Sequence, residues 1–260
     1  MFKSLALLAS GLLVVLLTSG MADAAAYPIR DAPTLTDNSL YGSGKIKTST
    51  CSGGAISTES SAAAKRTLTA LWRCLNTSWS AHFKRAKLPF TPAKLVVITK
   101  PTRFCGKSVK DARDSAYCRA TKTAAMVVDK KYYLGIREIY PFQSVSELYG
   151  EHLQHIIGIT DSARETPYDS EAESLEQNRR WSLQGDCLGA VSLRSVWKTA
   201  GRGSEGWPAM LKLMKENGDP GSGPRYWGKG ANIVYWSDRG FKSGDPGSCN
   251  TWKASSARVA

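Results

Sequence analysis

Two glutamates and a histidine recur at four-residue intervals within the stretch from Ser146 to Ile159. Side chains four residues apart lie on the same face of a helix. Glu147, Glu151 and His155 would therefore lie one above the other if this stretch is helical. Two carboxylates and one imidazole suit manganese, calcium or iron better than zinc. The sequence identifies no fourth ligand, so a metal site on this face is one interpretation among several.

A second interpretation treats the same stretch as an amphipathic surface helix, in which an apolar stripe faces the core. The stripe would hold Val145, Leu148, Tyr149, His152 and Ile156, and the opposite face Glu147, Glu151, Gln154 and His155. His152 lies on the stripe, so we expect a hydrogen-bonded core histidine there rather than a ligand. The isolated His82 is expected to be structural as well.

The elements that would position this helix follow from the spacing of apolar residues. Helices are expected over residues 60–83, 144–157, 170–197 and 207–214, and strands over 94–99, 124–128 and 131–136. Ser170 and Glu173 fit a capping box at the start of the longest later helix. Residues 161–170 are expected to be a polar connection. Strands followed by helices predict an α+β fold.

The N-terminus has the pattern of a secretory signal peptide. A basic start at Lys3 and an apolar run over residues 5–17 precede an A-x-A site that ends at Ala24. Residues 1–24 are therefore expected to be removed, and an uncleaved anchor is the alternative. No later segment is apolar enough to be expected to cross a membrane. We expect an extended arm over 25–50, a domain over 51–252 and a tail over 253–260.

Six cysteines follow the apolar run, and an even number in a secreted chain indicates disulfides. Six cysteines allow 15 pairings. Order and spacing favour the pairs Cys51–Cys74, Cys105–Cys118 and Cys187–Cys249. The absence of any C-x-x-C pair makes a cysteine zinc site the weaker interpretation.

Charge is distributed unevenly along the chain, which has a net charge of +13. Residues 41–140 hold 19 Lys and Arg against 5 Asp and Glu, whereas residues 141–180 hold 3 against 8. A basic half attracts polyanions, and outside a cell an anionic envelope polymer is the expected partner rather than nucleic acid. A solvated basic surface is the alternative. No G-x-S-x-G, P-loop or dinucleotide motif occurs in the sequence.

Several short stretches, taken in order, resemble the secreted bacterial neutral zinc metallopeptidase family in its actinobacterial-type form. The resemblance covers about residues 40–252. It rests on Asn38-Ser39-Leu40-Tyr41, Cys74-Leu75-Asn76 with Trp79, Cys105-Gly106, Tyr117-Cys118, Tyr132-Tyr133-Leu134, Tyr149-Gly150 with Gln154, Leu183-Gln184-Gly185-Asp186-Cys187 with Gly189, Arg239-Gly240-Phe241 and Gly244-Asp245-Pro246 up to Cys249 and Thr251. It implies a zincin-type α+β domain, with a small N-terminal sheet, a helical active-site half and disulfide staples.

Family members resemble H-E-x-G-H-H-V-Q in one helix and E-L-Q-A-D-C in the next, where two histidines and the second-helix glutamate bind zinc. Glu147 and Glu151 stand at the histidine positions of this chain, Leu148 at the general base and Ser182 at the third ligand. The resemblance therefore implies a secreted pseudopeptidase without a zinc cofactor, acting as an extracellular binding protein for a peptide or an anionic envelope polymer. The alternative is an active metallopeptidase that uses Glu147, Glu151 and His155. Asp186, without a histidine partner, is expected to bond within its helix or to pair with Arg179 or Arg180.

Overall fold

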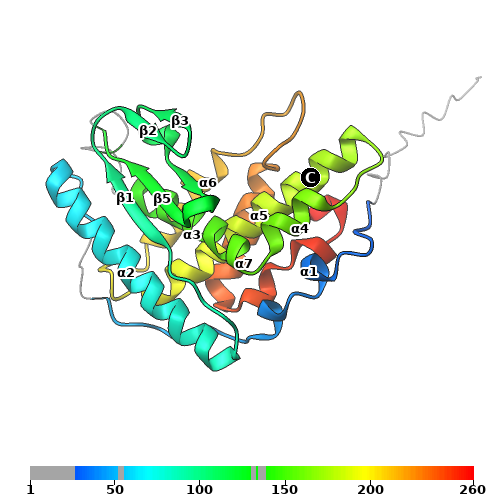
Figure 1. The fold of residues 1–260 in the computed structure, drawn as a ribbon, viewed down its shortest axis with the longest axis horizontal. Coiled ribbons are helices and arrows are strands. Elements are labelled where there is room, and N and C mark those ends of the chain that lie inside the picture. Colours follow the sequence, from blue (N-terminus) through cyan, green and yellow to red (C-terminus); the bar gives the residue numbers. More distant parts are fainter. Residues whose placement is uncertain (1–26, 52–55, 130–132, 134–138) are drawn as a thin grey trace, which may run out of the picture.

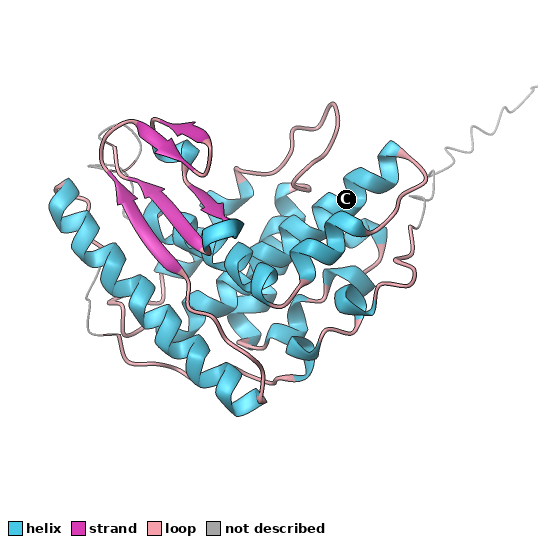
Figure 2. Cartoon of the chain, in the orientation of Figure 1, coloured by secondary structure: helices cyan, strands magenta, loops and turns pink. Residues whose placement is uncertain are grey.

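The structure is a computed structural model that describes residues 27–51, 56–129, 133 and 139–260. Its helices are α1 (Pro33–Thr36), α2 (Ser61–Ala86), α3 (Tyr140–Ile156), α4 (Ile159–Glu165), α5 (Glu171–Val196), α6 (Gly206–Lys215) and α7 (Gly230–Ser243). Its strands are β1 (Lys94–Ile98), β2 (Thr102–Phe104), β3 (Lys107–Val109), β4 (Ala116–Cys118) and β5 (Thr123–Val127). The predicted α+β class is confirmed (Figures 1 and 2).

A small sheet forms one side of the molecule, with β5 in the middle of the order β1-β5-β4. β1 runs parallel to β5, and β4 runs antiparallel to it. β5 is buried on both faces. On one face Ala124 and Met126 pack into the main core, and on the other Ala125 and Val127 pack against the β2–β3 hairpin. The strands expected over 94–99 and 124–128 are confirmed. The hairpin and β4 were not predicted, because strands of three residues are too short to show alternation.

The helical half is organised around α5, which packs against both α3 and α7 (Figure 1). The long helix α2 crosses the outer side of this core. The indole Nε1 of Trp79 on α2 donates a hydrogen bond of 2.8 Å to Ser192 Oγ on α5. One turn earlier on α2, Asn76 exchanges two hydrogen bonds with the backbone of Ala93, which leads into β1. α2 therefore joins the sheet to the helices.

Local signals at helix starts were largely correct. Ser60 caps α2 and Ser170 caps α5, each through its hydroxyl and the backbone N–H three residues later. The second half of the predicted capping box is displaced by one residue, because Glu173 accepts from the N–H of Asp169 and not from that of Ser170. α7 was not predicted, because its buried face includes Ser237 and Gly240, which carry no apolar signal.

Two expectations at the connections need correction. The arm over 25–50 is not extended throughout, since it contains α1 and a turn of 3-10 helix over Ser39–Gly42. The connection expected over 161–170 begins inside α4. The C-terminal tail expected over 253–260 packs against α7, since Trp236 Nε1 donates to the carbonyl of Arg258. The signal peptide predicted over 1–24 lies outside the described residues, as does the strand predicted over 131–136 apart from Tyr133, which lies in a turn.

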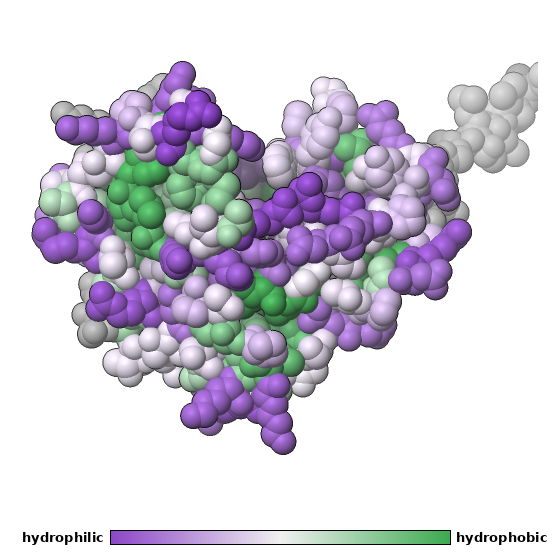
Figure 3. All heavy atoms as spheres, viewed as in Figure 1, coloured by the Kyte–Doolittle hydropathy of each residue, from purple (hydrophilic) through white to green (hydrophobic). Residues whose placement is uncertain are grey.

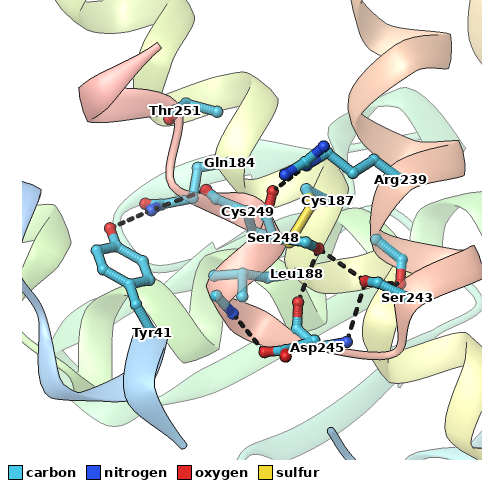
Figure 4. Close-up of a disulfide and its surroundings, with 12 residues drawn as sticks. Tyr41, Gln184, Cys187, Leu188, Arg239, Ser243, Asp245, Ser248, Cys249 and Thr251 are labelled. Carbon is cyan, nitrogen blue, oxygen red and sulfur yellow. Dashed lines mark hydrogen bonds between the residues drawn. A yellow bond between two sulfur atoms is a disulfide. The ribbon is translucent and has the colours of Figure 1, made fainter. Parts of the chain in front are cut away.

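Three disulfides join the pairs favoured by the sequence, Cys51–Cys74, Cys105–Cys118 and Cys187–Cys249. The last pair fixes the C-terminal segment to the middle of α5 (Figure 4). Within the part of the chain that the structure describes, no helix combines the length and the apolar composition needed to span a bilayer.

Candidate functional site

A cavity of about 460 Å³ lies between α3 and α5 and extends toward the loop that joins α6 to α7. Its lining residues are Arg113, Ser115, Gln143, Glu147, Leu148, Glu151, Gln154, Trp181, Ser182, Gly185, Asp186, Met214, Asn217, Trp227 and Ile233. The space-filling view is indented between the lobe that carries β2 and β3 and the α6–α7 loop (Figure 3). Glu147, Leu148, Glu151 and Ser182, singled out from the sequence, thus line one cavity together with Asp186.

These residues meet because two helix backbones touch. A Cβ atom at Gly150 of α3 would lie 2.1 Å from the carbonyl oxygen of Gly185 on α5. A Cβ at Gly189, one turn further along α5, would lie 2.2 Å from the carbonyl oxygen of Ser146. No side chain fits between backbones this close. The crossing places the Glu147–Glu151 face of α3 beside the Ser182–Asp186 face of α5.

The carboxyl groups in the cavity hold their protons more tightly than usual. Desolvation raises the pKa of Glu147, which accepts one hydrogen bond of 2.9 Å from Gln143 Nε2. Desolvation raises the pKa of Asp186 well above its ordinary value, and the neighbouring charge of Glu147 adds to the rise. The pKa of Glu151 rises to about 7, because desolvation outweighs the attraction of Arg119 and Lys107.

A buried amide network lies behind the cavity. Gln154 Nε2 donates to the carbonyl of Trp181 at 2.8 Å and to Gln184 Oε1 at 3.0 Å. Gln184 Oε1 also accepts from Trp252 Nε1, and Gln184 Nε2 donates to the hydroxyl of Tyr41 (Figure 4). Because Gln184 Oε1 is an acceptor, Gln154 must present its N–H₂ to it, and this fixes the orientation of the Gln154 amide. Gln154, expected on the polar face, is therefore a buried structural residue that also reaches the cavity.

The two histidines of α3 lie against Tyr117 of β4 instead of in the cavity. His152 is fully buried, with Nε2 bonded to the carbonyl of Thr91 and Nδ1 2.9 Å from Tyr117 Oη. A carbonyl accepts only, so Nε2 carries the proton and Nδ1 accepts from the tyrosine. Burial lowers the pKa of His152 to about 4. The prediction of a satisfied core histidine is confirmed.

His155 also contacts the Tyr117 hydroxyl, with its Nδ1 at 3.0 Å. It is not among the residues that line the cavity, so the face expected from Glu147, Glu151 and His155 does not converge on one point. His82, expected to be structural, is buried and bonded to the hydroxyl of Ser43.

The expected salt bridge between Asp186 and a neighbouring arginine is wrong. Arg180 pairs with Glu176 at 2.6 Å inside the core and also bonds the carbonyls of Thr251 and Ala254. Arg179 bonds the carbonyls of Val259 and Arg225. Asp186 makes no hydrogen bond or ion pair with any residue that the structure describes. Its carboxyl is left facing the cavity.

The α6–α7 loop carries a site residue that the sequence did not indicate. Trp227 lines the cavity and is 52% exposed. Asp219 Oδ2 accepts from the N–H groups of Trp227 and Gly228, at 2.6 and 2.7 Å. Asn178 on α5 donates to the carbonyl of Tyr226, so the loop is also fastened to the helix. The surrounding glycines and prolines suggested only a turn, and nothing in that pattern places an aromatic ring at a cavity.

The residues at the positions that the family resemblance marks as zinc ligands do not fit zinc. Two carboxylates and a serine hydroxyl replace the imidazole and carboxylate ligands that a tetrahedral zinc site uses. Leu148 offers no group that could take a proton from a bound water. Among the described residues, no group of three or more His, Cys, Asp or Glu side chains is arranged to hold a metal ion.

A second, smaller cavity of about 320 Å³ adjoins the first. Glu151 and Trp181 line both, and the second continues over α4 toward Tyr168. Tyr168 is 59% exposed. Because they share two lining residues, the two cavities form one groove that is lined by Trp227 in the first cavity and by Tyr168 in the second.

Comparison with known proteins gives a limited result. Two curated Escherichia coli proteins, from strain K12 and strain O6:H1, are both named "Uncharacterized protein YpfJ", and each is 24% identical to this chain over 194 residues. The aligned part covers 67% of this chain and 67% of each relative. No family and no solved structure matches. The chain is therefore similar to YpfJ over two thirds of its length, and its function has to be argued from the cavity.

Proposed function

We propose that this protein is a secreted, metallopeptidase-like binding protein whose peptidase chemistry has been lost. One observation carries the proposal. Three of the four positions that the family resemblance marks as ligands and base lie together on α3, and the fourth, Ser182, lies about 30 residues later on α5, yet all four line one cavity at the helix crossing. The residues at these positions, Glu147, Leu148, Glu151 and Ser182, are unsuited to zinc and to general-base catalysis. A cavity that is formed at these positions but lacks the zinc ligands and the general base supports binding without cleavage.

The proposed ligand of the groove is an extended peptide. Apolar walls from Leu148, Met214 and Ile233 alternate with carboxyl and amide groups, as is usual where a site fixes the orientation of a ligand. Trp227 and Tyr168 are exposed at the two ends and offer stacking surfaces. The alternative, an active peptidase with Glu147, Glu151 and His155 as ligands, is less well supported because His155 lies against Tyr117.

Restoring the family pattern tests the scaffold. The variant Glu147→His, Leu148→Glu, Glu151→His and Ser182→Glu should bind about one zinc ion per chain, because it would present two imidazoles and a carboxylate at one cavity. Zinc content after dialysis is the measurement, and the variant that keeps Ser182 is the matched control. A folded variant that retains no zinc would contradict the zincin-type geometry.

The natural protein is the second arm of this test. We expect it to leave casein intact whether or not zinc is added. Proteolysis that a chelator abolishes, together with stoichiometric zinc in the purified protein, would overturn the proposal and favour the alternative of an active enzyme.

A separate surface supports attachment to an anionic envelope polymer. α2 is about 39 Å long at 1.5 Å per residue and contains no acidic residue. Its outer face exposes Lys65, Arg66, Arg73, Lys84 and Arg85. Screening by salt weakens contacts between exposed charges, so the protein should be retained on isolated envelopes at low salt and released near 0.5 M NaCl.

Replacing Arg66, Arg73 and Arg85 of α2 by glutamine should abolish this retention. The matched control replaces three basic residues outside α2, Lys198, Lys212 and Lys253, by glutamine and changes the net charge equally. Equal loss in both variants would show that only the overall charge matters and would contradict a role for α2.

A further inference from the structure

We infer that the cavity between α3 and α5 is a recognition site for a lysine side chain of a bound peptide, with the ammonium group held between Glu147 and Asp186. This inference rests on the proposed function and gives its peptide ligand a chemistry. The first observation is that most of the ionisable side chains lining the cavity are acidic. Glu147, Glu151 and Asp186 contribute carboxyl groups, and among the described residues no cation forms an ion pair with Glu147 or Asp186.

The charge balance follows from the partners of each group. Arg113 is the cation among the described lining residues, and it already makes a bidentate ion pair with Asp111, at 3.1 and 2.9 Å. Its side chain is also 66% exposed, so it lies toward solvent. Glu147 has the amide of Gln143 as its hydrogen-bond partner, and Asp186 has none among the described residues. A cation placed between Glu147 and Asp186 would supply the missing countercharge.

A second observation is independent of the carboxyl groups. The Oε1 atoms of Gln143 and Gln154 are buried and accept no hydrogen bond from any described residue. These side chains are only 2% and 1% exposed, and both line the cavity. Gln154 cannot turn its amide round, because its Nε2 is committed to Gln184 and Trp181. A buried amide oxygen without a donor is costly, so both oxygens favour a ligand that brings N–H groups.

The chemistry of the ligand follows from this set of acceptors. An ammonium group has three donors and no acceptor, and the two carboxyls and two amide oxygens offer enough acceptors for all three donors. A metal ion would need its oxygen ligands on one coordination sphere, and the described acidic side chains are not grouped in that way. The apolar residues Leu148, Met214 and Ile233 provide walls for the aliphatic stem. Trp227 at the entrance offers a ring face to which a cation is attracted.

Long-range electrostatic attraction does not contribute to the expected affinity for a lysine side chain. The net charge of the protein is +13, which repels a cationic ligand at a distance. At physiological salt the Debye length is about 8 Å, so the carboxyls inside the cavity decide the binding. The effect of a single carboxyl should therefore be large compared with the effect of an equal charge change on the surface.

The experiment measures binding of two acetylated, amidated tetrapeptides, Ala-Lys-Ala-Ala and Ala-norleucine-Ala-Ala, by titration calorimetry on the full-length secreted protein. Norleucine keeps the aliphatic stem and removes the ammonium group. We expect the lysine peptide to bind at least tenfold more tightly than the norleucine peptide. Asp186→Asn should reduce this preference about tenfold, and Glu59→Gln, an equal charge change at an exposed position, should leave it unchanged.

Each outcome separates this inference from the proposed function. Equal binding of the two peptides would overturn the lysine site and leave peptide binding intact. Binding of neither peptide would count against both. Cleavage of either peptide would overturn the pseudopeptidase proposal. If Asp186→Asn unfolds, the comparison of the two peptides on the natural protein still decides the inference.

Discussion

Gly150→Ala should unfold the protein or lower its free energy of unfolding by about 4 kcal/mol or more. Single substitutions have effects of this size through only a few mechanisms, and severe overpacking is one of them. The added methyl carbon would lie 2.1 Å from the carbonyl oxygen of Gly185 and 2.8 Å from its carbonyl carbon. Both atoms belong to the backbone of α5, so no side chain can rotate away. Relief requires the two helices to separate, which would open the core around Leu153 and Leu183.

Urea unfolding followed by tryptophan fluorescence measures the effect, and Gly42→Ala is the matched control. A Cβ at Gly42 would meet no atom within 4 Å, and the residue is not in the left-handed backbone region. Its free energy of unfolding should stay within about 0.5 kcal/mol of the natural protein. If the Gly150→Ala variant were as stable as the natural protein, α3 and α5 could not cross this closely. The geometry described for the cavity would then be wrong as well.

The same glycines show how much of the site could be predicted. The resemblance named Gly150, Gly185 and Gly189 as marks of two motifs, and the structure gives them a physical role as the contact between two helices. The sequence could predict which residues share a helix face. It could not supply the side on which α5 crosses α3, because that depends on packing between residues more than 30 positions apart. The direction in which His155 turns depends on Tyr117 in the same way.

The parts of the fold that were missed share a cause. α7 packs on α5 through Gly240, where a Cβ would lie 2.4 Å from the carbonyl of Cys187. A glycine that is essential for packing weakens the helical pattern from which a helix is predicted. Likewise, the role of Trp227 depends on Asp219, eight residues earlier, which holds the loop by its backbone. Local patterns predicted the longer elements, and the contacts between elements determined the cavity.

Glu151→Gln should make the protein more stable than its natural form at neutral and alkaline pH and leave it unchanged in acid. The pKa of Glu151 rises from 4.5 to about 7 in the folded protein. Between these values the folded state holds a proton that the unfolded state has released, so the free energy of unfolding falls as pH rises. At about 1.4 kcal/mol per pKa unit, this pKa difference lowers the free energy of unfolding by roughly 3 kcal/mol at most. Glutamine has no charge to desolvate and avoids this loss.

The natural protein alone would not reveal the effect. His152 has a pKa of about 4, below the ordinary 6.5, and a lowered pKa makes stability rise with pH over that interval. The two residues therefore oppose each other between about pH 4.5 and 6.5. The difference in free energy of unfolding between Glu151→Gln and the natural protein isolates Glu151. It should be near zero at pH 4 and reach about 2–3 kcal/mol by pH 8.

The matched control is Glu59→Gln, whose side chain is exposed and whose difference from the natural protein should stay flat across the same range. Urea unfolding at each pH gives the values. If the lysine site is correct, the lysine tetrapeptide at saturation should also stabilise the natural protein more at pH 8 than at pH 4, because ionised carboxyls bind the ammonium group. A difference curve for Glu151→Gln that is flat from pH 4 to 8 would show that the carboxyl is hydrated as in free solution, and the cavity would then be too open to select a cation.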